Sequence, residues 1–230
     1  MAFAWSYSRW STWAKCPAMF KYRHIDKLPE PPSPALEKGR KLHDDIAGWL
    51  DGKTDQRPDA LRNFTTLADG LKQMPAEGRI AEKQIALDRE LRPVSWFGRN
   101  AWFRAAYDVL LPGDKEAQGV DWKSGRRYAT YTDQQQIFAL GAFWSQPGLE
   151  EFTGHWVYLD SAEVDSVTFT RDQAFGPSCD PAANEGLHGL WMANVAMMEA
   201  DRSFRPTPSK DSCRFCPFHQ DKGGPCTVGV

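Results

Sequence analysis

The sequence predicts an α/β fold, because helix-type and strand-type patterns occupy different parts of one chain of 230 residues. Before about residue 75, apolar residues recur at three- and four-residue steps, which is typical of amphipathic helices. From Arg79 the pattern changes to short alternating segments separated by proline and glycine, which is typical of strands. A further helical pattern over 131–145 interrupts these strands. A chain of this length can bury a sizeable core, so a single domain is the simplest expectation.

Three helices are expected in the first part of the chain. One covers 6–24, and Pro17 should kink or break it, because proline lacks the backbone N–H that a helix interior needs. The second runs over 34–50. It begins at the serine-proline pair of the stiff LPEPPSP loop and carries Gly39 on the side where something can approach closely. The third covers 58–74 and ends at a proline.

Five later segments show the alternation, or the β-branched and aromatic content, of strands; they are 81–91, 96–113, 117–125, 155–160 and 166–170. The first three should form a β-meander. Helices are expected over 131–145 and 183–200. The tail from Arg205 is rich in proline, glycine and cysteine, and it has too little apolar periodicity to fold without a cross-link.

The composition is that of a globular protein, with 41% apolar residues and a net charge of −2. No stretch of about 18 apolar residues occurs, and the N-terminus lacks the features of a cleaved leader, so we expect a soluble cytoplasmic protein with no membrane contact. Residues 1–43 hold eight Lys or Arg against three Asp or Glu. This local basic surface can steer an anionic ligand, although a solvated helix face explains the same charges equally well.

The motif of greatest chemical interest is GVDWKSG, residues 119–125, in the third expected strand. Side chains alternate along a strand, so Asp121 and Lys123 point one way and Trp122 points into the opposite layer. A carboxylate beside an ammonium suits phosphodiester hydrolysis. The carboxylate can hold a divalent cation, while the lysine orients a water or offsets charge developing on phosphorus. Taken alone, the pair also fits an exposed ion pair worth under about 1 kcal/mol.

Four further motifs accompany this one; they are G-x-x-x-H at Gly39–His43, E-x-x-I-x-L at Glu82–Leu87, an aspartate at Asp108, and Q-x-x-x-aromatic at Gln134–Phe138. Together with D-x-K-x-G at Asp121–Gly125, their order and spacing resemble the RecB-like branch of the PD-(D/E)xK nuclease superfamily over nearly the whole chain. The resemblance implies a restriction-endonuclease-like α/β core, in which a central mixed β-sheet is flanked by helices.

The resemblance also implies a metal site. It makes His43, Asp108 and Asp121 side-chain ligands of Mg²⁺ or Mn²⁺, with the backbone carbonyl of Trp122 as a further candidate. Two carboxylates and an imidazole form a mixed oxygen and nitrogen site that suits either ion. Glu82 matches the early-strand acid of the family and could hold a water on the metal or a second ion, while a surface glutamate in a polar strand is an equally good interpretation.

Three more roles follow from the resemblance. Lys123 would position the attacking water, with Asp108 and Asp121 as its catalytic partners. Gln134 matches the glutamine that family members carry near the active site. Arg126 and Arg127, which follow the active strand, would contact DNA. Phe138 departs from the usual tyrosine, so any hydrogen bond made by that tyrosine would be lost.

The cysteines resemble those of the iron-sulfur subgroup, which includes CRISPR-associated RecB-like exonucleases, AddB-type nuclease domains and phage exonucleases. By this resemblance four cysteines would ligate one [4Fe-4S] cluster; they are Cys16, Cys213, Cys216 and Cys226. Tetrahedral Zn²⁺ uses the same ligand set, and spacing cannot separate the two. The cluster would join segments 1–30 and 205–230 within a single domain spanning 1–230. Cys179 stands apart.

The expected function is that of a metal-dependent DNA exonuclease acting on single-stranded DNA or DNA ends. Family behaviour connects it with recombination and repair, phage replication or CRISPR adaptation, in a bacterial host cell or encoded by its phage, with a protein partner from one of those pathways. The alternative is a non-catalytic DNA-end-binding or assembly subunit whose cluster is structural or redox-sensing. Against it, the sequence keeps four residues of which degenerate members typically lose at least one; they are His43, Asp108, Asp121 and Lys123.

Overall fold

The structure is a computed structural model that describes residues 4–125 and 131–230 of the chain. The described chain forms two compact units. The central unit comprises Ala4 and Pro34–Trp191, and the terminal unit comprises Trp5–Ser33 and Met192–Val230. The terminal unit therefore brings the two ends of the chain together, whereas the central unit is almost one continuous segment. The organisation as one domain over 1–230 stays a prediction.

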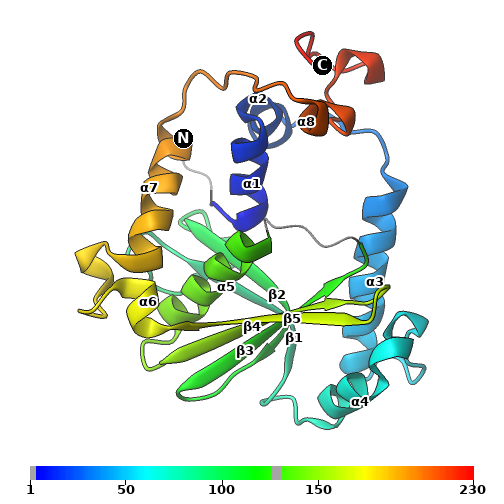
Figure 1. Cartoon of the computed structure of the whole chain (residues 1–230), viewed down its shortest axis with the longest axis vertical. Coiled ribbons are helices and arrows are strands. Elements are labelled where there is room, and N and C mark those ends of the chain that lie inside the picture. The colour runs from blue at the N-terminus through cyan, green and yellow to red at the C-terminus, as the bar shows by residue number, and fades with distance from the viewer. Residues whose placement is uncertain (1–3, 126–130) are drawn as a thin grey trace. The chain divides into compact units, whose positions relative to one another are not determined.

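The central unit is built on one five-stranded mixed sheet whose strand order follows the sequence (Figure 1). All neighbouring strands are antiparallel except β3 and β4, which are parallel. A parallel pair needs a long crossover, and the connection that contains helix α5 (Tyr131–Ser145) supplies it. The first three strands form the expected meander. The strands are β1 (Ile80–Leu87), β2 (Phe103–Leu111), β3 (Glu116–Lys123), β4 (Glu151–Tyr158) and β5 (Glu163–Thr170).

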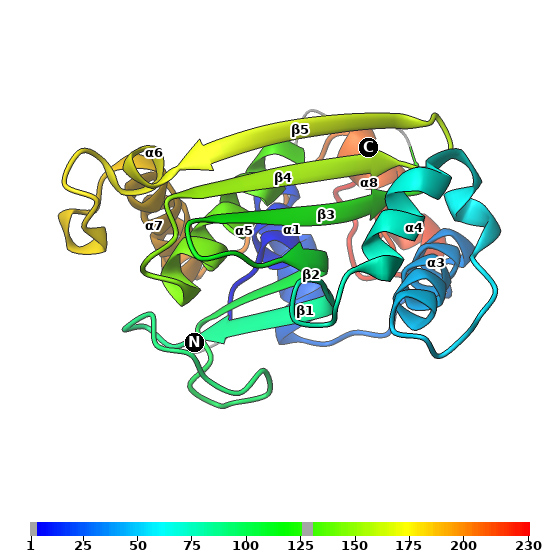
Figure 2. The same cartoon turned by 90° about the horizontal axis from the view of Figure 1, so that it is seen from below.

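Helices cover both faces of this sheet, as Figure 2 shows. On one face, α3 (Pro34–Leu50) and α4 (Thr65–Gln73) pack on β2, β3 and β4 through a buried apolar cluster that includes Trp122. On the other face lies α5, where the hydroxyl of Tyr107 in β2 donates to the carbonyl of Phe138 at 2.6 Å. A central mixed sheet flanked by helices is the predicted α/β core, and this prediction is confirmed.

The remaining helices of the central unit are short. The expected helix over 58–74 is split into a 3-10 helix and α4, and the expected helix over 183–200 begins later because Asn184 has a left-handed backbone. None of the helices in the described residues is long and apolar enough to cross a membrane. The other elements are η2 (Asp59–Phe64), α6 (Arg171–Phe175), η3 (Pro181–Ala183) and α7 (Gly186–Ala200), which continues into the terminal unit.

Two predicted strands, 81–91 and 96–113, are too long, because the chain leaves the sheet at Asp88 and returns to it at Phe103. The carboxylate of Asp88 accepts hydrogen bonds from two backbone N–H groups that follow it, at 3.0 and 2.9 Å. These bonds close a turn that competes with the strand. The aromatic residues between Asp88 and Phe103 therefore belong to a structured loop and not to the sheet.

The terminal unit is made of short helices from both chain ends. Cys16 is extended between two of them and Pro17 begins the second, so the predicted break at this proline is confirmed. Phe20 stacks on Phe204 with ring centroids 6.2 Å apart, which joins the two ends of the chain. Its elements are α1 (Tyr7–Lys15), α2 (Pro17–Phe20), the π-helical η1 (Lys21–Ile25), the end of α7, α8 (Lys210–Arg214) and η4 (Gln220–Lys222).

Candidate active site

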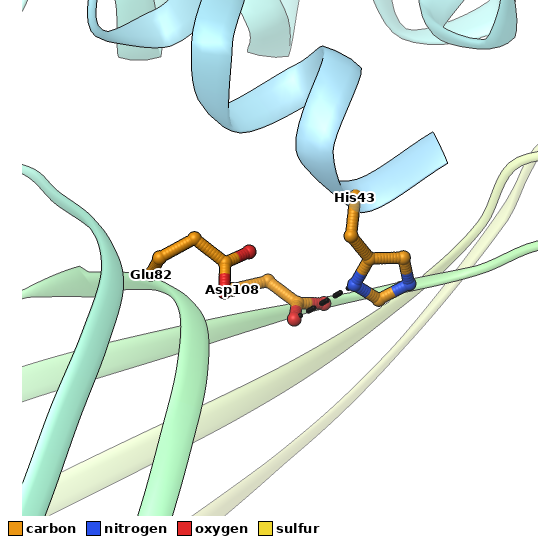
Figure 3. Close-up of side chains that lie close together, drawn as sticks. All are labelled: His43, Glu82 and Asp108. Carbon is orange, nitrogen blue, oxygen red and sulfur yellow. Dashed lines mark hydrogen bonds and ion pairs between the residues drawn. The ribbon is translucent and has the colours of Figure 1, made fainter. Parts of the chain in front are cut away.

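Helix α3 holds His43 over the sheet. Ile46 and Leu50 lie on the same side of the helix as His43 and are buried in the cluster against the strands. His43 Nδ1 lies 2.9 Å from Oδ1 of Asp108 in β2 (Figure 3). Burial by itself lowers the pKa of His43, but the hydrogen bond and the charge of Asp108 outweigh burial and raise the pKa. The helix thus delivers an imidazole to a carboxylate of the sheet.

Glu82 lies opposite Asp108 in the β1–β2 pair. The ladder pairs Ala81 with Val109 and resumes only at Lys83, so it is interrupted at Glu82. Glu82 has a left-handed backbone with a φ of 50°, a conformation that costs about 1–3 kcal/mol and is frequent at functional sites. Burial, and then the charge of Asp108, raise the pKa of Glu82. The sheet therefore tolerates a strained residue where two carboxylates meet.

His43, Glu82 and Asp108 form a compact group of possible metal ligands, shown together in Figure 3. Each offers one donor atom, and these atoms all lie within 4.8 Å of one another. Two carboxylates and one imidazole are a donor set that accommodates Mg²⁺ or Mn²⁺. No other group of three such side chains in residues 4–125 and 131–230 is this compact.

Asp108 also joins β2 to β3. The β2–β3 ladder ends at the pair Val109 and Val120, and beyond that point Oδ2 of Asp108 accepts a hydrogen bond from the backbone N–H of Trp122 at 2.7 Å. The side chain thus replaces a ladder bond. Because His43 occupies its other oxygen, Asp108 is held at both ends of its carboxylate.

Asp121, Lys123 and Gln134 form a closed ring of contacts at the end of β3. Lys123 Nζ lies 2.5 Å from Oδ2 of Asp121 and donates to Oε1 of Gln134 at 2.9 Å. Gln134, in α5, in turn donates through Nε2 to Oδ1 of Asp121 at 2.9 Å. Asp121 is only 4% exposed, and burial together with the charge of Asp108 raises the pKa of its carboxyl group to about 6, against the opposing effect of Lys123.

The alternation expected for this strand is confirmed, because Trp122 is buried in the apolar cluster on the opposite face. Asp121 does not belong to the compact group of three donors within the described residues, although its charge acts on the pKa of His43. Trp122 contributes its backbone N–H to Asp108, and the metal-binding role of its carbonyl stays a prediction. Phe138 lies in the core against the ring of Tyr107, with centroids 4.7 Å apart.

Arg126 and Arg127, the predicted DNA-binding residues, lie outside the described residues. Their role stays a prediction.

One contact that positions the site has no counterpart in the sequence prediction. Gly154 in β4 lies under Gln135 of α5, and a Cβ at this position would overlap the Gln135 amide. Gln135 is fully buried and neighbours Gln134, so the absence of a side chain at Gly154 lets α5 approach the sheet closely. An isolated glycine beside a strand pattern is the signal that could have indicated this close approach.

The four cysteines of the predicted cluster all lie in the terminal unit, while Cys179 lies in the central unit. Burial raises the pKa of the Cys216 thiol, and charges on the other three cysteines raise it further. No three of their sulfur atoms, all within the described residues, lie within 4.8 Å of one another. The three contributing residues are Cys16, Cys226 and Cys213.

A mixed sheet whose first three strands carry carboxylates and a lysine, with an imidazole from a covering helix, is an arrangement typical of metal-dependent hydrolases. The family model of the PD-(D/E)XK nuclease superfamily matches residues 4–220, and the chain belongs to this superfamily. Its members use divalent metals and act on DNA, which supports metal-dependent nuclease activity.

No curated protein matches the sequence. One solved structure, the crystal structure of SSO0001, is similar over 96% of this chain and 85% of that chain, with 13% identity and a TM-score of 0.46. This weak likeness does not bear on function.

Proposed function

We propose that the protein is a metal-dependent DNA exonuclease of the RecB-like branch, which hydrolyses phosphodiester bonds at DNA ends or in single strands. The observation that carries the proposal is the ring of Asp121, Gln134 and Lys123 beside the compact group of His43, Glu82 and Asp108. The RecB-like order of these motifs along the chain supports a role in recombination and repair, phage replication or CRISPR adaptation.

His43 and Asp108 would hold the cation, with Glu82 as a further ligand or as the acceptor of a water on the metal. Their donor atoms are close enough together for one ion, and their chemistry suits Mg²⁺ or Mn²⁺. Each oxygen of Asp121 has one partner, Lys123 or Gln134, and keeps a lone pair through which it could join them. When bound, the cation supplies Lewis-acid polarisation of the phosphodiester.

Lys123 is the residue that would position the attacking water. Its ammonium group is fixed by two acceptors, Oδ2 of Asp121 and Oε1 of Gln134, so it is oriented before substrate arrives. A fixed positive charge also offsets the charge that develops on the phosphoryl oxygens. Gln134 acts as a positioning residue, because it holds the carboxylate and the ammonium in one arrangement.

We also propose that Cys16, Cys213, Cys216 and Cys226 ligate a [4Fe-4S] cluster in the terminal unit. The resemblance of their order along the chain to the iron-sulfur subgroup supports the proposal. A single zinc ion with Zn–S bonds of about 2.3 Å needs sulfurs about 3.8 Å apart, closer than the described sulfurs allow without rearrangement, whereas a cubane is larger. Iron and sulfide in brown protein would support this assignment, and colourless protein with stoichiometric zinc would contradict it.

The test of the nuclease uses end-labelled DNA, single- and double-stranded, linear and circular, with anaerobically purified protein and Mn²⁺. We expect linear DNA to be degraded and circular DNA to survive. Asp121→Asn and Lys123→Met should each lower the rate about 10²–10³-fold. Lys115→Met, which changes an exposed lysine paired with Glu150, is the matched control and should leave the rate unchanged.

If the wild-type protein bound DNA ends but never cut them, the proposed enzymatic activity would be contradicted. The alternative, a non-catalytic DNA-end-binding subunit, would then be favoured. Degradation of circular DNA would contradict the exonuclease assignment alone.

A further inference from the structure

The loop between β1 and β2, residues 88–102, encloses a cavity that no part of the proposed chemistry uses. The cavity has a volume of about 290 Å³. Its walls combine guanidinium groups with one aromatic ring and one side-chain amide; they include Arg89, Arg92, Arg99, Asn100 and Trp102. Glu82 and Asp108 lie about five residues away along their strands, so the cavity is roughly 17 Å from the candidate active site.

The β1–β2 loop has a defined conformation. Trp102 donates its backbone N–H to the carbonyl of Leu87 at 2.7 Å, and Val94 donates to Ala86 at 2.9 Å. Arg104 lies over the ring of Trp96, 5.5 Å from its centre. A surface that is ordered before binding loses less conformational entropy when a ligand arrives.

The three arginines that line the cavity differ in their partners. Arg92 is paired with both acidic residues of the loop, Asp88 at 2.8 Å and Glu90 at 2.9 Å. Arg89 lies over the ring of Trp102. Arg99 is exposed and forms no ion pair with any residue that the structure describes. The cavity lining therefore carries three guanidinium groups against two carboxylates, a net charge of +1.

The same loop carries the most exposed large apolar side chain of the described residues, Phe97, at 85%. Gly98 follows it in a tight turn, where a Cβ would lie 2.9 Å from the carbonyl oxygen of Ser95. The turn thus presents an aromatic ring to solvent two residues before Arg99 in the chain.

We propose that the β1–β2 loop binds a single strand of nucleic acid at a distance from the cleavage site. Arg99 would bind a phosphate, and a base would stack on Phe97. An unpaired strand offers an anion and a planar ring in each nucleotide, which matches the alternation of guanidinium and aromatic groups here. A protein partner would instead need a contiguous apolar patch, and Phe97 is the one exposed large apolar side chain of residues 88–102.

This inference rests on the proposed function for its biological sense, because the loop would hold a substrate strand while its end is cut. It assigns to the loop an effect on binding and no effect on the chemical step.

The experiment measures binding of a fluorescent oligothymidylate of about 15 nucleotides by anisotropy in EDTA, so that no cutting is required. Phe97→Ala should weaken binding about tenfold, and Arg99→Ala should weaken it and lower the slope of log K against log salt by about one. Arg62→Ala, an exposed arginine of the same unit paired with Asp59, is the matched control and should bind like wild type.

The same variants are then assayed with Mn²⁺. Phe97→Ala should raise KM for a long single strand with kcat unchanged, and should leave hydrolysis of bis(p-nitrophenyl) phosphate unchanged. The loop proposal would be overturned if both loop variants bound the oligonucleotide as tightly as wild type, or if duplex DNA competed equally well. The proposed nuclease activity would still stand in that case, provided that the wild-type protein cuts DNA. If the wild-type protein never cut DNA but the loop variants still bound the oligonucleotide more weakly, the loop proposal would be supported and the proposed nuclease activity contradicted.

Discussion

The two compact units are stabilised in different ways. The central unit has a continuous five-stranded sheet, and an apolar cluster joins three of its strands to α3 and α4. The longest helix that lies wholly in the terminal unit is α1 (Tyr7–Lys15), and the other complete helices there have three to five residues. Short helices are not stable by themselves, so their order depends on tertiary contacts or a cross-link.

This difference suggests different roles for the catalytic candidates of the central unit and the cysteines of the terminal unit. All candidate catalytic side chains that the structure describes lie in the central unit, where burial fixes their positions and shifts their pKa values. The four cysteines of the predicted cluster lie in the terminal unit, whose complete helices are short. We therefore expect packing to control the active site and ligation to control the order of the chain ends.

The largest expected effect follows from removing one cysteine of the predicted cluster, which tests whether ligation orders the chain ends. Cys213→Ser should destabilise the terminal unit by more than about 4 kcal/mol, because bound metal supplies folding free energy that its small core lacks. Hydrogen exchange in segments 5–33 and 192–230 measures the loss of order. Cys179→Ser, in the central unit, is the control and should leave exchange there unchanged; unchanged protection in Cys213→Ser would show that no cross-link exists.

Packing in the central unit is tested at Gly154. Gly154→Ala should cost about 1–3 kcal/mol, because the new methyl group overlaps the buried Gln135, and it should also lower nuclease activity by shifting α5 and Gln134. Urea denaturation gives the free energy of unfolding. The double variant with Gln135→Ala should recover part of the stability.

Gly70→Ala in α4 is the matched control, because a Cβ there meets nothing within 4 Å, and it should be neutral or slightly stabilising. A cost at Gly154 no larger than that at Gly70 would mean that α5 does not depend on this close approach.

A smaller effect is expected at Glu82, where the central unit tolerates strain. Glu82→Gly should be about 1 kcal/mol more stable than Glu82→Ala, because only glycine adopts a φ of 50° without steric cost. Both variants should lose nuclease activity if the carboxylate takes part in the site. Equal free energies of unfolding for the two variants would indicate that the left-handed conformation is not enforced.

An effect confined to acidic pH is expected at His24 in the terminal unit. Burial, with the charges of Arg9 and Arg23, lowers the pKa of His24 to about 4. The unfolded chain, with a histidine pKa of about 6.5, then binds the proton more readily than the folded one. Stability is full above about pH 6.5 and falls as the pH decreases towards 4. His24→Gln should flatten this part of a plot of melting temperature against pH; identical slopes would contradict the assignment.

Local sequence determined several features of this protein. Helices over 34–50 and 131–145 have the predicted bounds, because apolar periodicity and proline act over a few residues. The same is true of the break at Pro17. The alternation that separates Asp121 and Lys123 from Trp122 follows from strand geometry alone. The compact group adds Glu82 to His43 and Asp108, residues that the motif order had already singled out.

Only the tertiary structure decided how these residues meet. The left-handed backbone of Glu82, the bridge made by Gln134 and the close approach at Gly154 depend on pairings between segments far apart in the chain. The sequence pattern extended two strands into residues 88–102, where the carboxylate of Asp88 ends the first strand and a loop presents Phe97 to solvent. Periodicity reports which residues prefer burial, but it cannot report which distant segment buries them.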